Sequence, residues 1–200
     1  MEFFSGIRRY EAIDLLIWGA VVCILEGLVV TAGLGLFPSQ PYVVSVVPAV
    51  VAIVYMRWGV PGIAHAMAGG FVLCASSHAG IGSYVVYMVG NLLSVLALVL
   101  LKGLGRRKVR DGAFLSAAFA ASVALSMQLG RGFVAVLLGG GLGGVVDFVS
   151  TDVLSGVFAV VVVCIARRLD GVFEYQRDYL LRTAVDEKGV GDEGDGLSCP

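Results

Sequence analysis

The sequence predicts an all-α integral membrane protein, a six-helix transmembrane bundle with an external re-entrant or loop segment before its last helix. Composition is the first reason: 58% of the 200 residues are hydrophobic, 14% are charged, and the mean hydropathy is +0.91. A soluble domain of this size cannot bury so much apolar surface. Pattern is the second reason, because long unbroken apolar runs favour helices over the alternating strands of a membrane barrel.

Six apolar segments define the expected helices, at about 15–37, 42–56, 60–77, 83–101, 112–129 and 132–166. A helix needs roughly 20 apolar residues to cross the hydrocarbon core of a bilayer. The first segment is about twice as long as the core of a secretory signal peptide, and Glu11 and Asp14 interrupt its approach, so it is expected to be a retained span. The loop 38–41 has a proline at each end and predicts a turn.

The last segment is too long for one span and barely long enough for two. Four polar residues interrupt its middle: Asp147, Ser150, Thr151 and Asp152. We therefore interpret 132–146 as a re-entrant or loosely helical external segment that leads into a last span at about 151–166. A seventh full span would place the Arg167 and Arg168 pair outside, against the positive-inside rule.

The same rule orients the whole bundle. With six spans and the N-terminus inside, thirteen of the fourteen Lys and Arg residues lie on the cytoplasmic side, and Arg131 is the exception. We expect a multi-pass protein of the cell membrane with both termini in the cytoplasm.

Four regions follow from this topology. They are a cytoplasmic N-terminus (1–14), a six-span membrane domain (15–168), an amphipathic cytoplasmic helix (169–184) and an acidic, disordered tail (185–200). In the third region, apolar residues recur at roughly helical spacing among charges, which predicts a helix on the membrane surface or against a partner.

Ionisable and polar residues inside the spans are candidates for function, because burying them in lipid is costly. Glu26 lies near the middle of the first span, where a ligand or cavity role competes with a structural hydrogen bond. Tyr84, Tyr87 and Asn91 share one helix face at i, i+3 and i+7. Tyr84 also fits the aromatic belt found at membrane interfaces.

An arginine within a membrane needs a counterion, which an aspartate or the carboxylate of a ligand can provide. A structural ion pair and a binding role are therefore both open for Arg131. With their neighbours at the outer ends of the spans, these residues predict a polar pocket that opens outward. The candidate ligand-binding residues are Glu26, His78, Tyr84, Tyr87, Asn91, Gln128, Arg131, Asp147 and Asp152.

Common signatures of intramembrane enzymes, such as HExxH and GxSxG, do not occur in the sequence. The four cysteines lack the spacing of a zinc site or a disulfide framework. The glycine run 139–144 matches GxGxxG without the strand and helix of a dinucleotide fold, which favours close packing or a flexible loop. No catalytic residue, metal, cofactor or nucleic-acid partner is expected.

Gly19, Cys23 and Gly27 form a small-residue stripe at four-residue spacing on the first span. Such stripes let helices approach closely in lipid. The stripe predicts either packing within this chain or contact with another membrane subunit.

The stretch 46–72, VVPAVVAIVYMRWGVPGIAHAMAGGFV, contains Arg57, Gly59, Gly62 and a Gly69-Gly70 pair. It resembles the turn between the second and third helices of substrate-binding S components of energy-coupling-factor transporters. These proteins take up vitamins and trace nutrients. The resemblance extends over about 15–168 and includes the chain length, the six spans, the termini and the arginine pair after the last helix.

This resemblance implies a small-molecule nutrient bound near the external face and docking on a coupling membrane subunit that carries two ABC ATPases. Docking in that family often uses an Ala-x-x-x-Ala pattern on the first helix. Carried over, the docking residues would be Gly19, Cys23 and Gly27, in which the alanines are replaced. No set of residues selects one vitamin.

The alternative is a structural or regulatory multi-pass membrane protein without a transport role. In this case the polar residues would only join helices, and the amphipathic segment LDGVFEYQRDYLLR would recruit a partner.

Overall fold

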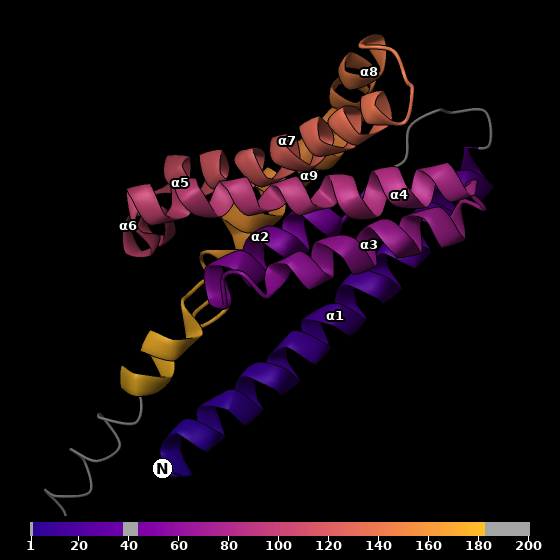
Figure 1. Ribbon diagram of the computed structural model, residues 1–200. Helices are drawn as coiled ribbons and strands as arrows, with labels where there is room; N and C mark the ends of the chain where they lie inside the picture. Colours follow the sequence, from indigo (N-terminus) through magenta and orange to yellow (C-terminus); the bar gives the residue numbers. More distant parts are fainter. Residues whose placement is uncertain (1, 38–43, 183–200) are drawn as a thin grey trace, which may run out of the picture.

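The computed structural model describes the backbone of residues 2–37 and 44–182, and their side chains from Ile7 onward. Within these ranges the protein is helical and contains no strand (Figure 1). The predicted turn at 38–41 and the predicted tail at 185–200 lie outside the described residues.

The helices follow one another along the chain as α1 (Glu2–Leu36), α2 (Val47–Arg57), α3 (Gly62–Ser76), α4 (Ile81–Gly90), a 3-10 helix η1 (Asn91–Val95), α5 (Leu96–Leu104), α6 (Arg106–Asp111), α7 (Ala113–Leu137), α8 (Gly143–Thr151) and α9 (Val153–Ala166). α4, η1 and α5 join into one stretch, Ile81–Leu104. A further short helix occupies 176–182.

Three of these stretches are long and apolar enough to cross a bilayer: Ile7–Leu36, Ile81–Leu104 and Ala113–Leu137. α8 and α9, which bend by 43° at their junction, can make a fourth. α2 and α3 are shorter, with 11 and 15 residues. The described chain is thus all-helical with three or four candidate spans, which is compatible with a membrane location. The six-span topology stays a prediction.

α2 forms the centre of the bundle, and all eleven of its residues are buried. It packs against α3, α7 and α9 (Figure 1). Two glycines bring α3 directly onto it: a Cβ atom at Gly62 would lie 2.5 Å from the Tyr55 ring, and one at Gly69 would lie 2.4 Å from Val47. The Tyr55 hydroxyl is paired with Ser94 Oγ at 2.6 Å. α2 is therefore surrounded by protein on every side.

α7 continues to Leu137, beyond the end of the expected apolar segment 112–129. The expected external segment 132–146 is not one unit. Its first residues belong to α7, and its last belong to α8, which returns along α7. Gly132 allows this return, since a Cβ atom there would lie 2.8 Å from the Val145 Cα atom.

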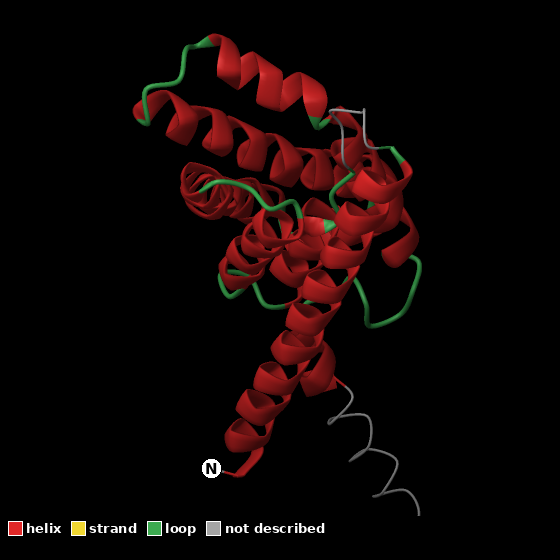
Figure 2. Cartoon of the chain, turned by 90° about the vertical axis from the view of Figure 1, so that its right-hand side faces the viewer, coloured by secondary structure: helices red, strands yellow, loops and turns green. Residues whose placement is uncertain are grey.

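α1 is one continuous helix from Glu2, so the described part of the expected N-terminal region 1–14 belongs to the same helix as the first span. Its N-terminal end extends beyond the body of the bundle (Figure 2), while Ile7 is buried and Tyr10 packs against Trp58. Its large apolar side chains on the side away from the bundle are exposed, Ile17 and Leu28 among them.

The expected amphipathic helix 169–184 is helical only at 176–182 within the described residues, after a series of turns. The segment folds back onto the bundle. Phe173 is 1% exposed and packs against Phe119, with ring centroids 6.4 Å apart. We call this end of the bundle, which also carries α6, the α6 end, and the opposite end the α8 end (Figure 1).

Candidate functional site

Arg131, on α7, is the centre of a buried polar cluster, and it is 2% exposed. Its Nε donates a hydrogen bond to Asn91 Oδ1 at 2.8 Å, and its Nη1 donates to Asp152 Oδ2 at 2.8 Å. Its guanidinium lies over the Tyr87 ring, 4.7 Å from the centroid. The structure therefore brings four of the candidate residues into direct contact.

Glycines position this cluster by letting α4 and α7 touch backbone to backbone. A Cβ atom at Gly130 would lie 2.0 Å from the Gly90 carbonyl oxygen, and one at Gly90 would lie 2.6 Å from Arg131 Cα. Asn91, one residue beyond Gly90, also donates from Nδ2 to the Ala66 carbonyl of α3 at 2.8 Å. α3, α4 and α7 thus converge on one point.

Asp152 supplies the negative charge from the bend between α8 and α9. Gln128 Nε2 donates to the Asp152 backbone carbonyl at 3.1 Å and so stabilises the bend. Phe148 of α8 packs edge-on against Tyr87, with centroids 6.0 Å apart. The α8 helix therefore covers the aromatic side of the cluster.

Glu26, on α1, is fully buried and accepts a hydrogen bond at Oε2 from the Val46 backbone N–H at 2.8 Å. The neighbouring Ser45 N–H donates to Ser155 Oγ of α9 at 2.8 Å. Glu26 lies within electrostatic range of Arg131 and Asp152. It therefore belongs to the same cluster, although none of the hydrogen bonds above joins it to the arginine.

Two buried atoms of opposite charge in this cluster have no hydrogen-bond partner among the described residues, Glu26 Oε1 and Arg131 Nη2. Charged groups in a protein interior are normally fully hydrogen-bonded, because an unmet hydrogen bond costs free energy. One atom is a hydrogen-bond donor on the guanidinium, and the other is an acceptor on the carboxylate, next to Ser45.

Three candidate residues lie away from this cluster. His78 is exposed at the turn between α3 and α4, with φ at 52°. Tyr84 packs on Phe71 with centroids 5.6 Å apart, and the Asp147 side chain is exposed on α8. The structure thus joins six of the nine candidates: Glu26, Tyr87, Asn91, Gln128, Arg131 and Asp152.

The small-residue stripe on α1 faces α3. A Cβ atom at Gly19 would lie 3.8 Å from His65 Nε2, and one at Gly27 would lie 3.6 Å from Val72. Cys23 packs against the hydrophobic core. This geometry corresponds to the first of the two alternatives for the stripe, packing within the chain.

A second buried ion pair, between Asp14 and Arg57, was not among the candidates. Arg57 donates from Nη2 and Nε to the two carboxylate oxygens at 2.7 and 2.9 Å, and both side chains are nearly buried. Arg57 Nη1 also donates to the carbonyls of Gly171 and Val172. The pair joins α1 and α2 to the segment after α9. The sequence contains one indication of this pair, since Asp14 directly precedes the apolar segment 15–37 and Arg57 directly follows the segment 42–56.

No group of three or more His, Cys, Asp or Glu side chains within the described ranges could hold a metal ion. The side chains of the Arg131 cluster interact through hydrogen bonds and an ion pair. Comparisons with protein-family models, with curated proteins and with solved structures find no match to this chain.

Proposed function

We propose that this chain is the membrane-embedded substrate-binding component of an energy-coupling-factor uptake transporter, which binds a vitamin or other trace nutrient near the external face. The observation that carries the proposal is the buried pair of unpartnered atoms, Arg131 Nη2 and Glu26 Oε1. The resemblance of 46–72 to the S components supports the transporter class.

The chemistry of the cluster suggests the substrate class. A buried guanidinium N–H favours an anionic acceptor such as a carboxylate, and a buried carboxylate oxygen favours a hydrogen-bond donor. The Tyr87 face, already beside the guanidinium, can also contact a ring. The expected ligand is therefore a small molecule with an acidic group and a hydrogen-bond donor.

In the proposed topology, the six spans are α1, α2, α3, the α4–η1–α5 stretch, α7 and the bent α8–α9 pair. The N-terminus is cytoplasmic, so the α6 end faces the cytoplasm and the α8 end faces outward. The positive-inside rule supports this orientation, since the basic residues within the described ranges, other than Arg131, then lie at the cytoplasmic end.

The proposal also requires a coupling membrane subunit with two ABC ATPases. Because α3 covers Gly19 and Gly27, that subunit has to dock on another surface. The side of α1 away from the bundle is available, and it exposes Ile17, Ile24 and Leu28.

Ligand identification tests the proposal. Native mass spectrometry of protein purified in detergent from cells grown in rich medium should find a bound small molecule, and one member of a vitamin panel should raise the melting temperature. Arg131→Gln removes the charged donor, so we expect at least about tenfold weaker binding. The matched control is Arg9→Gln, which removes an exposed arginine of α1 and should bind normally.

Glu26→Gln provides a second variant if Arg131→Gln does not fold. It keeps an acceptor for the Val46 N–H and removes the charge. Protein without a bound molecule, and without a thermal shift from any vitamin, contradicts the proposal. Equal binding by wild type, Arg131→Gln and Glu26→Gln contradicts the assigned site.

A further inference from the structure

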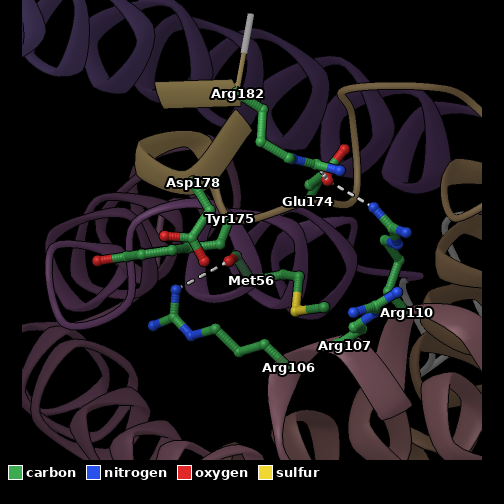
Figure 3. A pocket seen from close by; sticks show the side chains of 8 residues that line it. All are labelled: Met56, Arg106, Arg107, Arg110, Glu174, Tyr175, Asp178 and Arg182. Atoms are coloured by element: carbon green, nitrogen blue, oxygen red, sulfur yellow. Dashed lines mark hydrogen bonds and ion pairs between the residues drawn. The ribbon is translucent and has the colours of Figure 1, made fainter. Parts of the chain in front are cut away.

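A second polar site lies at the α6 end, far from the Arg131 cluster along the bundle. It is a cavity of about 410 Å³ between the end of α2, α6 and the segment after α9 (Figure 3). Its lining residues carry four guanidinium groups and two carboxylates. They are Met56, Arg106, Arg107, Arg110, Glu174, Tyr175, Asp178 and Arg182.

Glu174 forms ion pairs with two of the four arginines. Arg110 Nη1 donates to Glu174 Oε1 at 2.5 Å, and Arg182, from the short helix 176–182, contacts the same oxygen. Figure 3 shows both guanidinium groups directed at this carboxylate from opposite sides. Arg110 Nε also donates to Asp111 Oδ1 at 3.0 Å. The four guanidinium groups therefore face the carboxylates of Glu174, Asp178 and Asp111, and positive charge still exceeds negative charge around the cavity.

Arg106 stacks on Tyr175, with its guanidinium carbon 4.0 Å from the ring centroid. Its Nη1 donates to the Met56 carbonyl at 3.2 Å. Burial lowers the pKa of this guanidinium, and the nearby Tyr175 and Asp178 side chains only partly oppose that effect. An anion bound in the cavity would compensate for the lost hydration.

Arg107 is the most accessible of the four, with 91% of its side chain exposed. Its closest carboxylate, on Asp111, is 3.9 Å away. Its guanidinium can therefore turn toward a ligand without breaking a short contact. Arginine pairs well with phosphate oxygens because its planar group donates two parallel hydrogen bonds.

The helices before and after α6 in the chain expose apolar side chains. On α5, which leads into α6, Leu96 and Val99 are 55% and 68% exposed, and Phe114 at the start of α7 is 83% exposed. In a membrane these side chains would contact acyl chains, and the cavity would lie at the level of the headgroups. A soluble anion would make no use of this apolar surface.

We propose that this cavity binds the phosphate group of an anionic phospholipid, with its acyl chains along α5 and the start of α7. Arg106 and Arg107 bind the phosphate, and Glu174 keeps Arg110 and Arg182 in place around it. Basic cavities at helix ends are suited to anionic headgroups. This inference does not depend on the nutrient-binding proposal.

Lipid titration tests it on the full chain in a neutral detergent. We expect short-chain phosphatidylglycerol to raise the melting temperature with a saturable dependence, and phosphatidylcholine of the same chain length to have little effect. In Arg106→Gln/Arg107→Gln, the apparent Kd for phosphatidylglycerol should rise about tenfold, since two charge-assisted contacts are lost.

The matched control is Lys102→Gln/Lys108→Gln, which removes two exposed charges from the same region outside the cavity lining. Its apparent Kd should stay within about twofold of wild type. Equal weakening in both pairs would show diffuse attraction and overturn the site. If the double variant does not fold, Arg107→Gln alone, whose side chain is exposed, should still weaken binding several-fold.

Inorganic phosphate distinguishes the two sources of the anion. Stabilisation by inorganic phosphate at concentrations below those needed for phosphatidylglycerol would overturn the lipid assignment. Equal stabilisation by phosphatidylcholine would do the same.

Discussion

Asp152 is the counterion of Arg131, and its side chain ends 2.8 Å from the guanidinium. Removing one member of a buried ion pair leaves the other charge uncompensated, which costs about 3–5 kcal/mol. We therefore expect Asp152→Asn to lower the free energy of unfolding in detergent by that amount. The substitution keeps the side-chain shape and the backbone carbonyl that Gln128 contacts.

Asp147→Asn is the control, because Asp147 lies on α8 shortly before Asp152 and has an exposed side chain. Surface substitutions of this kind change the free energy of unfolding by no more than about 0.5 kcal/mol. If Asp152→Asn lowered the free energy of unfolding no more than Asp147→Asn does, the ion pair would contribute nothing to folding.

The cost of burial explains which site residues the sequence could predict. Glu26 and Asn91 stand inside apolar runs, and Arg131 stands between two runs and needs a counterion, so each was a candidate for a functional or structural polar contact. His78 and Asp147 stand near helix ends, where the sequence does not indicate which side faces the bundle. Tyr84 shares a helix face with Asn91 but lies about 10 Å further along the axis, where it packs on Phe71.

At the scale of helices, the contact between α4 and α7 depends on glycine. A Cβ atom at Gly130 would overlap the Gly90 carbonyl oxygen at 2.0 Å, and backbone cannot rotate away as a side chain can. Gly130→Ala should push the two helices apart, separate Asn91 from Arg131 and lower the free energy of unfolding by about 1–3 kcal/mol or more. Thermal unfolding in detergent measures the loss.

Gly103→Ala is the matched change on α5, where nothing lies within 4 Å of the added carbon. It should be neutral or stabilising by up to about 1 kcal/mol, because alanine favours a helix over glycine. Similar melting temperatures for the two variants would contradict the backbone contact.

The same glycines explain why the end of α7 could not be predicted. Glycine within an apolar run usually signals a helix end, and Gly130 and Gly132 surround the only charged residue nearby. In the structure both face the backbone of another helix, Gly90 in one case and Val145 in the other. That contact is tertiary, so no local pattern could indicate it. By contrast, the segment 60–77 was expected and α3 lies within it.

At the scale of the whole molecule, the α6 and α8 ends should lie on opposite sides of the membrane. We expect Gly141→Cys, in the loop before α8, to react with a membrane-impermeant thiol reagent in intact cells. Arg107→Cys, on α6, should react only after permeabilisation. Both variants are made in a protein whose four native cysteines are replaced by serine. After the cells are labelled, the protein is purified and its labelling is measured.

The starting cysteine-free protein is the control for background labelling. Labelling of both positions in intact cells would contradict the proposed orientation. A chain with five or seven spans would place its C-terminal segment outside, which a third cysteine at exposed Asp170 would reveal.

The position of α2 has a consequence for biosynthesis. This helix is buried on every side, and the Ser45 N–H just before it is bound by Ser155, a residue synthesised 110 positions later. The ribosome has to synthesise α9 before α2 can reach its final surroundings. Until then α2 lacks part of its final surroundings, so the bundle closes only after most of the chain has been synthesised.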